Sequence, residues 1–214
     1  SGSNIFREGE AVNSFYLPVS AGVDPLTGNQ LYWVDRDKNN KIVPRYKTDD
    51  VTLTTNSREV VGNRIPDLYG SLTNDFRYKG FDLSILTTYS IGGEMLDGVY
   101  GSMMNVGYKG YVWHKNALRR WQKPGDITTM KDIRDRNVTT GASSRFVQKN
   151  NTLQWSSLTM SYNFRPEQLK KLHLSGLRLS FTMNDLFYWS TIRQERGLDY
   201  PYSRSFNLTT NIIF

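Results

Sequence analysis

The sequence predicts an all-β fold, an antiparallel meander of strands, on three observations. Aromatic residues make up 13% of the chain although its mean hydropathy is only −0.55, and 17 glycines can supply turns; a disordered chain would be poor in aromatic residues. Apolar and polar residues alternate with a period of two in several segments, as in strands with one apolar face. The connections between these segments are short on one side and long on the other.

The period-two alternation predicts strands over 67–79, 80–91, 151–164, 175–189 and 203–214. In the last of them, one face carries Phe206, Leu208, Ile212 and Phe214, whereas the opposite face is almost wholly polar. Lys79-Gly80 is the only interruption between the first two strands and predicts a tight hairpin. Pro166 followed by Glu167 predicts the first turn of a short helix before the fourth strand.

The lengths of the connections favour a membrane barrel over a soluble sandwich. The turns at 79–80 and 165–176 lie on one side of the meander, and the long segments before 67 and over 92–150 lie on the other. Outer-membrane barrels combine short periplasmic turns with long extracellular loops. We therefore expect barrel strands within 67–214, a long extracellular loop over 92–150, and a mainly extracellular loop region with short strands over 1–66. Five strands are fewer than a complete barrel needs, so a barrel fragment is expected.

Four charged residues are expected on the polar faces of their strands. A Lys or Arg on a lipid-facing position near the membrane midplane costs roughly 2–4 kcal/mol, whereas a water-filled lumen accepts it. The charges that alternation places on the polar face, and that we expect to face the lumen, are Asp75, Arg77, Asp82 and Arg178. Aromatic residues near the strand ends, Tyr78 and Phe81 at one end and Tyr188 and Trp189 at the other, predict interfacial girdles.

Composition and motifs argue against enzymatic and nucleic-acid functions. The net charge of +7 comes from dispersed Lys and Arg residues that build no binding module, so no nucleic acid is expected as a partner. The chain has no cysteine, its two histidines (His114 and His173) are far apart, and no Ser/His/Asp triad or phosphate-binding glycine loop is visible. DRDKNNK at 35–41 lacks the glycine and the glutamate of a calcium loop, and a turn is expected there. We expect no catalytic, cofactor-binding or metal-binding residue.

Several motifs, taken in order, resemble the C-terminal part of SusC/RagA-type TonB-dependent transporters of Bacteroidetes. These motifs are YKGFDLSI (78–85), WQKPGD (121–126), LTMSYNF (158–164), NDLFYWST (184–191) and GLDYPYSRSFNLTTNIIF (197–214), and AGVDPLTGNQLYW (21–33) resembles a stretch that precedes them. The chain departs from the usual continuation after Pro-Gly-Asp, where it has ITTMKDIRDR at 127–136.

The resemblance implies that the chain supplies the C-terminal part of a large, 22-stranded type of transmembrane barrel in the Gram-negative outer membrane. It implies an importer of oligosaccharides or peptides, and it implies partners: the rest of the barrel and its plug domain, a SusD-like surface lipoprotein as a lid, the TonB complex acting through an N-terminal part absent here, and lipid. Phe206, Leu208, Ile212 and Phe214 resemble the terminal signal that the outer-membrane assembly machinery recognises.

The long loop contains an aromatic segment that the resemblance connects to the substrate or the lid. WHKNALRRWQ at 113–122 predicts a helix with Trp113, Ala117, Leu118 and Trp121 on one face. Tyr111, Trp113 and Trp121 are candidate contacts to substrate or lid protein, and the alternative is that this stripe folds the loop onto itself. Two other functions stay open: a soluble carbohydrate-binding β-sandwich, and a small complete eight-stranded barrel with an adhesive or structural role.

Overall fold

The protein is described by a computed structural model, which places residues 2–104, 113–135, 142–170, 173–192 and 204–214. The chain divides into two compact units. The first unit is Ser1–Ile65 and Gly93–Lys149 with Gln194–Gly197, and the second, the sheet unit, is Pro66–Gly92, Asn150–Arg193 and Leu198–Phe214. None of the helices in the described ranges is long and apolar enough to cross a membrane.

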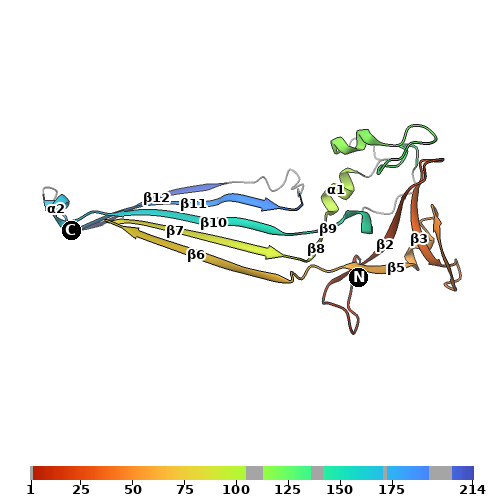
Figure 1. The fold of residues 1–214 in the computed structure, drawn as a ribbon, viewed down its shortest axis with the longest axis horizontal. Helices are drawn as coiled ribbons and strands as arrows, with labels where there is room; N and C mark the ends of the chain where they lie inside the picture. Colours follow the sequence, from red (N-terminus) through yellow and green to blue (C-terminus); the bar gives the residue numbers. More distant parts are fainter. Residues whose placement is uncertain (1, 105–112, 136–141, 171–172, 193–203) are drawn as a thin grey trace. The chain divides into compact units, whose positions relative to one another are not determined.

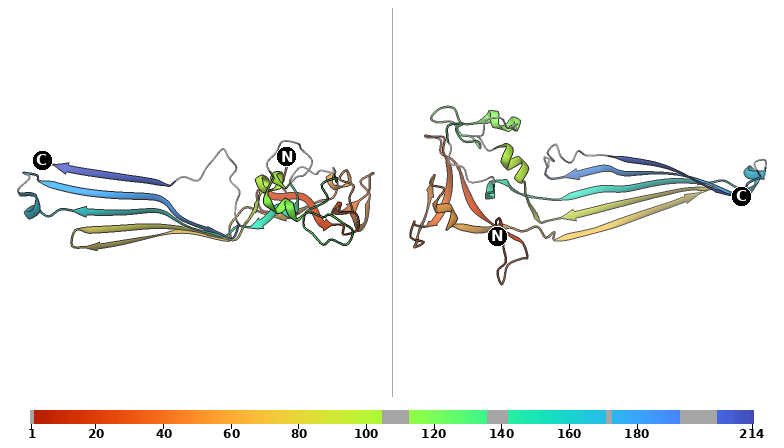
Figure 2. Two further views of the ribbon diagram at one scale, coloured as in Figure 1. Left: turned by 90° about the horizontal axis from the view of Figure 1, so that it is seen from above. Right: turned by 180° about the vertical axis from the view of Figure 1, so that it is seen from behind.

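The sheet unit is one five-stranded antiparallel meander (Figure 1). Its strands follow in the order β12-β11-β10-β7-β6, with the bounds β6 Leu68–Tyr78, β7 Phe81–Ile91, β10 Thr152–Asn163, β11 Gly176–Ser190 and β12 Ser205–Ile213. Figure 2 shows these strands overlapping at one end and spread apart at the other, as expected of a twisted sheet. The all-β antiparallel fold predicted from the alternation is thus confirmed, and the five strands lie within one or two residues of the predicted ranges.

The turn before β7 and the connection before β11 both have the local structure predicted from the sequence. Lys79 and Gly80 both have positive φ, +46° and +91°, which is the requirement of a type I′ hairpin turn. Between β10 and β11, helix α2 (Pro166–Leu169) starts with proline, and the Gln168 side chain accepts a 2.8 Å hydrogen bond from the Arg165 backbone N–H. Leu169 is buried, so this short helix is also held by packing.

The first unit contains more strand than the sequence predicts. Strands β1 Asn4–Ile5, β2 Ser14–Val23, β3 Gln30–Arg36 and β4 Ile42–Thr48 pair in that order, and β5 Arg58–Gly62 pairs with β2. The expectation of mainly loop with short strands over 1–66 is therefore corrected, since β2 alone has ten residues. Register shifts between Ser20 and Gly22 and between Val34 and Arg36 interrupt the alternation, which hides these strands from a period-two search. DRDKNNK forms the turn between β3 and β4, as expected.

The rest of the first unit folds around a small apolar core. It comprises β8 Glu94–Leu96 paired with β9 Val147–Lys149, helix α1 Gly98–Met103, and three 3₁₀ helices, η1 Leu53–Thr55, η2 Lys115–Arg119 and η3 Ser144–Phe146. The core is formed by Met104, Ala117, Met130 and Phe146. Segment 93–149 is therefore partly a folded structure.

The predicted aromatic face of residues 113–122 is wrong. Only Lys115–Arg119 is helical, and it is a 3₁₀ helix, which turns every three residues and does not align positions four apart. Ala117 and Trp121 are each 4% exposed, whereas Leu118 is 72% exposed. The helix ends because Arg120 is extended and forms a bridge to Met130.

Candidate functional site

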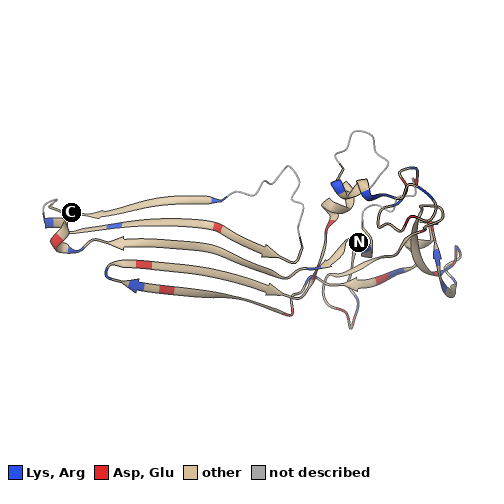
Figure 3. Ribbon diagram, turned by 45° about the horizontal axis from the view of Figure 1, so that its top comes forward, with Lys and Arg blue, Asp and Glu red and all other residues tan. Residues whose placement is uncertain are grey.

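Charged residues lie on strands of the sheet unit near its hairpin turn (Figure 3), and the strand register places them on the polar face. Together they form a cluster with the Asp82 carboxylate at its centre. Arg77 Nε is 3.7 Å from Asp82 Oδ1, Arg178 Nη2 is 3.6 Å from Asp82 Oδ2, and Asn163 Nδ2 donates a 2.9 Å hydrogen bond to Oδ2. Four strands, β6, β7, β10 and β11, thus contribute to one cluster.

Strand register explains why these residues meet. Arg77 pairs directly with Asp82, Asp82 pairs with Ser161, and Asn163 pairs with Arg178. Directly paired residues point to the same face of a sheet, with Cβ atoms about 5 Å apart. The register therefore places Arg77, Asp82 and Arg178, which alternation had assigned to polar faces strand by strand, on a single common face.

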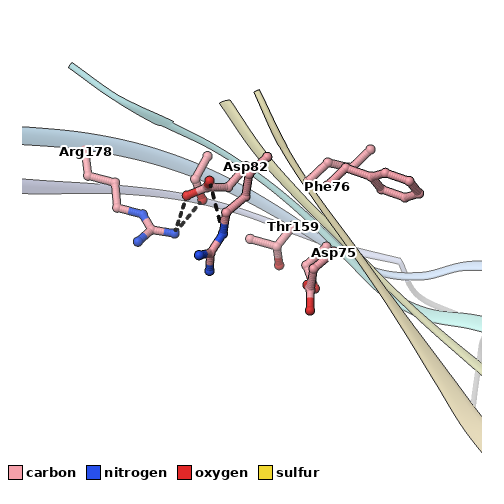
Figure 4. A pocket seen from close by; sticks show the side chains of 9 residues that line it. Asp75, Phe76, Asp82, Thr159 and Arg178 are labelled. Atoms are coloured by element: carbon pink, nitrogen blue, oxygen red, sulfur yellow. Dashed lines mark hydrogen bonds and ion pairs between the residues drawn. The ribbon is translucent and has the colours of Figure 1, made fainter. Parts of the chain in front are cut away.

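A shallow cavity of about 140 Å³ lies beside this cluster. Figure 4 shows Asp75, Asp82, Thr159 and Arg178 along it, with the Phe76 ring pointing away. Two of its lining residues are hydrogen-bonded: Arg178 Nη2 donates to Ser161 Oγ at 3.2 Å, and Ser161 Oγ donates in turn to Ser180 Oγ at 2.9 Å. Such a site offers positively charged hydrogen-bond donors and negatively charged acceptors for contacts with polar groups.

The ion pairs of the cluster are accessible. The side chains of Arg77, Arg178 and Asp82 are 84%, 50% and 27% exposed, and ion pairs with such exposure typically contribute only about 0–1 kcal/mol. The guanidinium groups can therefore exchange these contacts for others at small cost. Within the described part of the chain no group of three or more His, Asp or Glu is arranged to hold a metal ion.

The opposite face of the sheet is apolar and largely open. Its exposed residues include Leu68, Leu72, Phe76, Tyr78, Phe81, Met160, Leu179, Phe206, Leu208 and Ile212. The five strands contain five charged residues: Asp75, Arg77, Asp82, Arg178 and Asp185. The register places the first four of them on the polar face. An apolar surface of this extent indicates contact with lipid or with another protein surface.

The terminal strand extends this apolar face to the edge of the sheet. Phe206 and Leu208 pair with Met183 and Phe181 of β11, and the Phe206 ring stacks on Phe181 with centroids 6.4 Å apart. Phe206, Leu208, Ile212 and Phe214 are 45–89% exposed. In the described residues β12 pairs on one side only, so its outer edge presents backbone donors and acceptors.

The three candidate aromatic residues of the long loop do not form one site. Trp121 is buried, and its indole Nε1 donates a 2.9 Å hydrogen bond to the Pro25 carbonyl, so it holds the loop against the connection between β2 and β3. A Cβ added to Gly28 would lie 2.6 Å from the Trp121 ring. Trp113 is 36% exposed, and Tyr111 lies outside the described residues.

Sequence analysis did not detect a buried polar cluster in the first unit. Lys131 Nζ lies 3.3 Å from Asp135 Oδ2, and both side chains are less than 10% exposed. The Asp135 carboxylate also accepts a hydrogen bond from the Gln30 backbone N–H, and Arg145 donates to the Gln30 side chain. Burial lowers the pKa of Lys131, and the nearby Asp135 opposes that shift in part. The cluster fastens the long loop to strand β3 and could not be inferred from four residues so far apart in the sequence.

Comparisons with known proteins agree with the fold and with the motifs. The chain is 26% identical over 216 aligned residues to TonB-dependent receptor P3 of Formosa agariphila, covering 93% of this chain and 19% of that protein. It is 27% identical over 141 residues to TonB-dependent receptor P39 of the same organism, covering 63% of this chain and 13% of the relative. The chain thus spans about a fifth or less of these relatives' length. No family model matches it.

Two solved structures share the fold. A chain in the structure of the RagAB peptide transporter matches 84% of this chain with a TM-score of 0.66 and 19% identity, and a chain in the RagAB peptide importer in its open-open state matches 100% with a TM-score of 0.72 and 19% identity. This chain covers 20% and 24% of those chains. The names of all four similar proteins denote receptors or transporters rather than enzymes, in agreement with the function class expected from the sequence. The ordered motifs, the sequence matches and the shared fold agree: the chain is similar to part of a TonB-dependent receptor, and it shares the fold of chains in the RagAB structures.

Proposed function

We propose that the chain is the C-terminal part of the barrel wall of an outer-membrane importer, with its apolar face toward lipid and its polar face toward the lumen. The observation that carries this proposal is that charged and apolar side chains lie on opposite faces of the five-stranded sheet. Every charged residue of β6 and β7, and Arg178 of β11, lies on one face by register, while the other face is exposed and apolar. A membrane barrel requires this division.

The orientation follows from the connections at the two ends of the strands. Two short connections, Lys79-Gly80 and the α2 turn, join strands at one end, and they are the periplasmic turns in this proposal. In the described residues the chain passes between the two units at 65/66, 92/93 and 149/150, next to the opposite ends of strands β6, β7 and β10. Residues 1–66 and 92–150 are then extracellular, and 67–214 contains the barrel strands.

In this arrangement the Asp82 cluster faces the interior of the barrel near its periplasmic end. Barrels of 22 strands carry a plug in the lumen, so Asp75, Arg77, Asp82 and Arg178 contact the plug domain or the water around it. Energy coupling through TonB is assigned to other parts of the receptor. Phe206, Leu208, Ile212 and Phe214 serve as the signal for the assembly machinery, which can pair with the open edge of β12.

The cargo proposed is an oligosaccharide or a peptide, delivered with the help of a SusD-like surface lipoprotein. The RagAB neighbours, which are named as a peptide transporter and a peptide importer, support the peptide class. The partly exposed Trp113 is the described loop residue that remains a candidate contact to cargo or lid.

Uptake by cells tests the transport proposal. A strain lacking the full-length receptor is complemented with it, and the accumulation of a labelled tryptic peptide mixture and of a labelled oligosaccharide mixture is followed with and without a proton-motive-force uncoupler. We expect complementation to restore uptake of one of the two mixtures and the uncoupler to abolish it. Unchanged uptake of both mixtures would contradict the importer function.

Thiol labelling tests the orientation separately. This chain has no cysteine, so Ile127→Cys, at a position that is 92% exposed, and Glu167→Cys in helix α2 introduce single thiols into it. On intact cells a membrane-impermeant maleimide should label Ile127→Cys and leave Glu167→Cys unlabelled until the outer membrane is opened. The reverse pattern would invert the topology.

A further inference from the structure

Strands β10 and β11 each contain additional residues at the same level of the sheet. The register between β10 and β7 shifts between Trp155 and Ser157, so Ser156 is an additional residue of β10. The same interval of β11 holds two residues, Asp185 and Leu186. These are two adjacent β-bulges, and a bulge bends its strand and re-aims the side chains that it carries.

The bulge in β11 turns the Asp185 carboxylate to the polar face. Asn184 lies on that face in phase with Arg178, so strict alternation would place Asp185 on the apolar face. Instead, Gln154 Nε2 donates a 2.5 Å hydrogen bond to Asp185 Oδ1, and Gln154 pairs with Thr88 on the polar face. Asp185 has φ +55°, a left-handed conformation that is uncommon outside glycine. Such conformations concentrate at sites that bind ligands.

Three side chains come together at this bulge. Tyr188 pairs directly with Gln154, which brings their Cβ atoms to about 5 Å, and Gln154 contacts Asp185. Beside them Thr88 Oγ1 and Ser156 Oγ are 2.9 Å apart. The Tyr188 side chain is 38% exposed, and because it lies on the polar face its predicted place in an interfacial girdle is wrong. The site therefore combines a carboxylate, an amide, a phenol and two hydroxyl groups from three strands.

The two halves of the polar face differ in charge. On the loop side of Leu86, Asp185 is the one charged residue of the five described strands, because the other four charged residues lie between the turns and that level. The side chains next to Asp185 are uncharged: Thr88, Gln154, Ser156 and Tyr188. A ligand whose charge is complementary to this half of the face is itself largely uncharged, and it makes its contacts through hydrogen bonds.

This set of groups fits one ring of an uncharged oligosaccharide. Hydroxyl groups donate and accept hydrogen bonds, and a carboxylate and an amide side by side supply acceptors and donors for them. A tyrosine ring offers an apolar surface to the C–H groups of a sugar and a hydroxyl at its tip. A peptide would instead bring its terminal carboxylate toward Asp185, and like charges placed together are unfavourable.

We propose that Gln154, Asp185 and Tyr188 form a sugar-binding site on the loop-side half of the lumen wall, and that the bulges direct Asp185 into it. Asp185 and Gln154 bond the hydroxyls of one sugar unit, and Tyr188 stacks on its ring. The inference rests on the proposed importer function and selects one of its two cargo classes. The likeness to the RagAB chains leaves this selection open, because a shared fold does not fix the side chains that contact cargo.

Uptake by cells that carry the full-length receptor tests the site. The cells are given a labelled mixture of neutral oligosaccharides from starch, xylan and mannan, or labelled tryptic peptides, and rates are compared at equal amounts of surface receptor. Asparagine adopts the left-handed conformation as readily as aspartate, so Asp185→Asn removes the charge and keeps the bulge. We expect the oligosaccharide concentration for half-maximal uptake to rise about tenfold or more in Asp185→Asn and in Tyr188→Ala.

Thr182→Ala is the matched control, because Thr182 lies on the same face of β11 but on the turn side of the bulge. Its half-saturating concentration should stay within about twofold of the wild type. Thiol protection tests contact directly in the purified full-length receptor. The oligosaccharide mixture should slow the reaction of Ser156→Cys with a maleimide, whereas tryptic peptides should not, and Thr182→Cys should react at the same rate with either mixture.

The outcomes separate the sugar-binding site from the importer function. Wild-type uptake of peptides alone would overturn the site and leave the importer intact. Oligosaccharide uptake with the same half-saturating concentration in the wild type, Asp185→Asn and Tyr188→Ala would also overturn the site. Uptake of neither mixture would contradict the importer function and the site with it. If the Asp185 variant does not assemble, the protection of Ser156→Cys decides, and its absence would overturn the site.

Discussion

Replacement of Leu158 by arginine tests the lipid-facing side of the sheet at its most sensitive level. Leu158 pairs with Ile85 and Met183, four residues along β7 from Phe81. That separation is about 13 Å along the strand and about 10 Å across the membrane, close to the middle of an apolar band about 25 Å tall. An arginine there should cost about 2–4 kcal/mol, which is roughly a 30- to 1,000-fold change in the folding equilibrium.

Thr159→Arg is the matched control, because the neighbouring residue points to the other face. Thr159 lines the same cavity as Asp75 and Asp82, where a cation is accepted, and the expected change is within about 0.5 kcal/mol. Both variants are made in the full-length receptor, refolded into phosphatidylcholine vesicles, and unfolded with urea while heat-modifiable gel mobility is followed. Equal midpoints for the two variants, or a larger loss for Thr159→Arg, would refute the assignment of faces.

Three further predictions concern other parts of the chain. Gly28→Ala should lower the melting temperature of the first unit, because Gly28 has φ +76° and an added Cβ would meet the Trp121 ring. The control is Gly9→Ala, at φ +84° with open space around it, which should be destabilised only by left-handed backbone strain of about 1–3 kcal/mol. Equal decreases in melting temperature for the two variants would contradict a role for the contact with Trp121. Burial lowers the pKa of Lys131 in the folded state below its usual 10.5. Between the lowered pKa of the folded state and 10.5, the unfolded state binds more protons than the folded state, so folding stability rises with pH in that range. The melting temperature of the wild type relative to Lys131→Met should accordingly rise between pH 7 and pH 10, and a pH-independent difference would contradict it. Phe214→Ser removes an exposed ring that contributes on the order of 1.5–3 kcal/mol even if it is fully buried in lipid, so the assembled receptor should melt at a nearly normal temperature. If Phe214 belongs to the assembly signal, pulse-chase labelling should show slower assembly of this variant. Normal assembly kinetics would exclude the signal role.

The sheet unit could be predicted from the sequence because one of its faces is chemically uniform. Leu158, Met160 and Tyr162 alternate with hydroxyl-bearing and amide residues, and burial of one face specifies register strongly. The bulges could not be predicted in this way. An additional residue such as Ser156 has no distinctive composition, and strict alternation places Trp155 on the polar face, whereas its pairing with Thr87 places it on the apolar face.

The candidate site was predictable in composition but not in geometry. Alternation assigned each charge to a polar face of its own strand. The meeting of Arg77, Asp82 and Arg178 depends in addition on the pairing of β7 with β10, which joins Asp82 to Ser161, a residue far away in the sequence. In the long loop, local pattern was overruled by tertiary contacts. Trp121 is held by the Pro25 carbonyl and by a backbone bond to Met130, and these contacts end the helix that the spacing of Trp113 and Trp121 suggested.

The most direct test of the account is a structure of the full-length receptor embedded in a lipid nanodisc. The account predicts that strands β6, β7, β10, β11 and β12 form a continuous stretch of the barrel wall, with Leu158 and Phe181 against lipid and the Asp82 cluster facing the lumen. A sheet whose apolar face is covered by other parts of the protein, away from the bilayer, would contradict it.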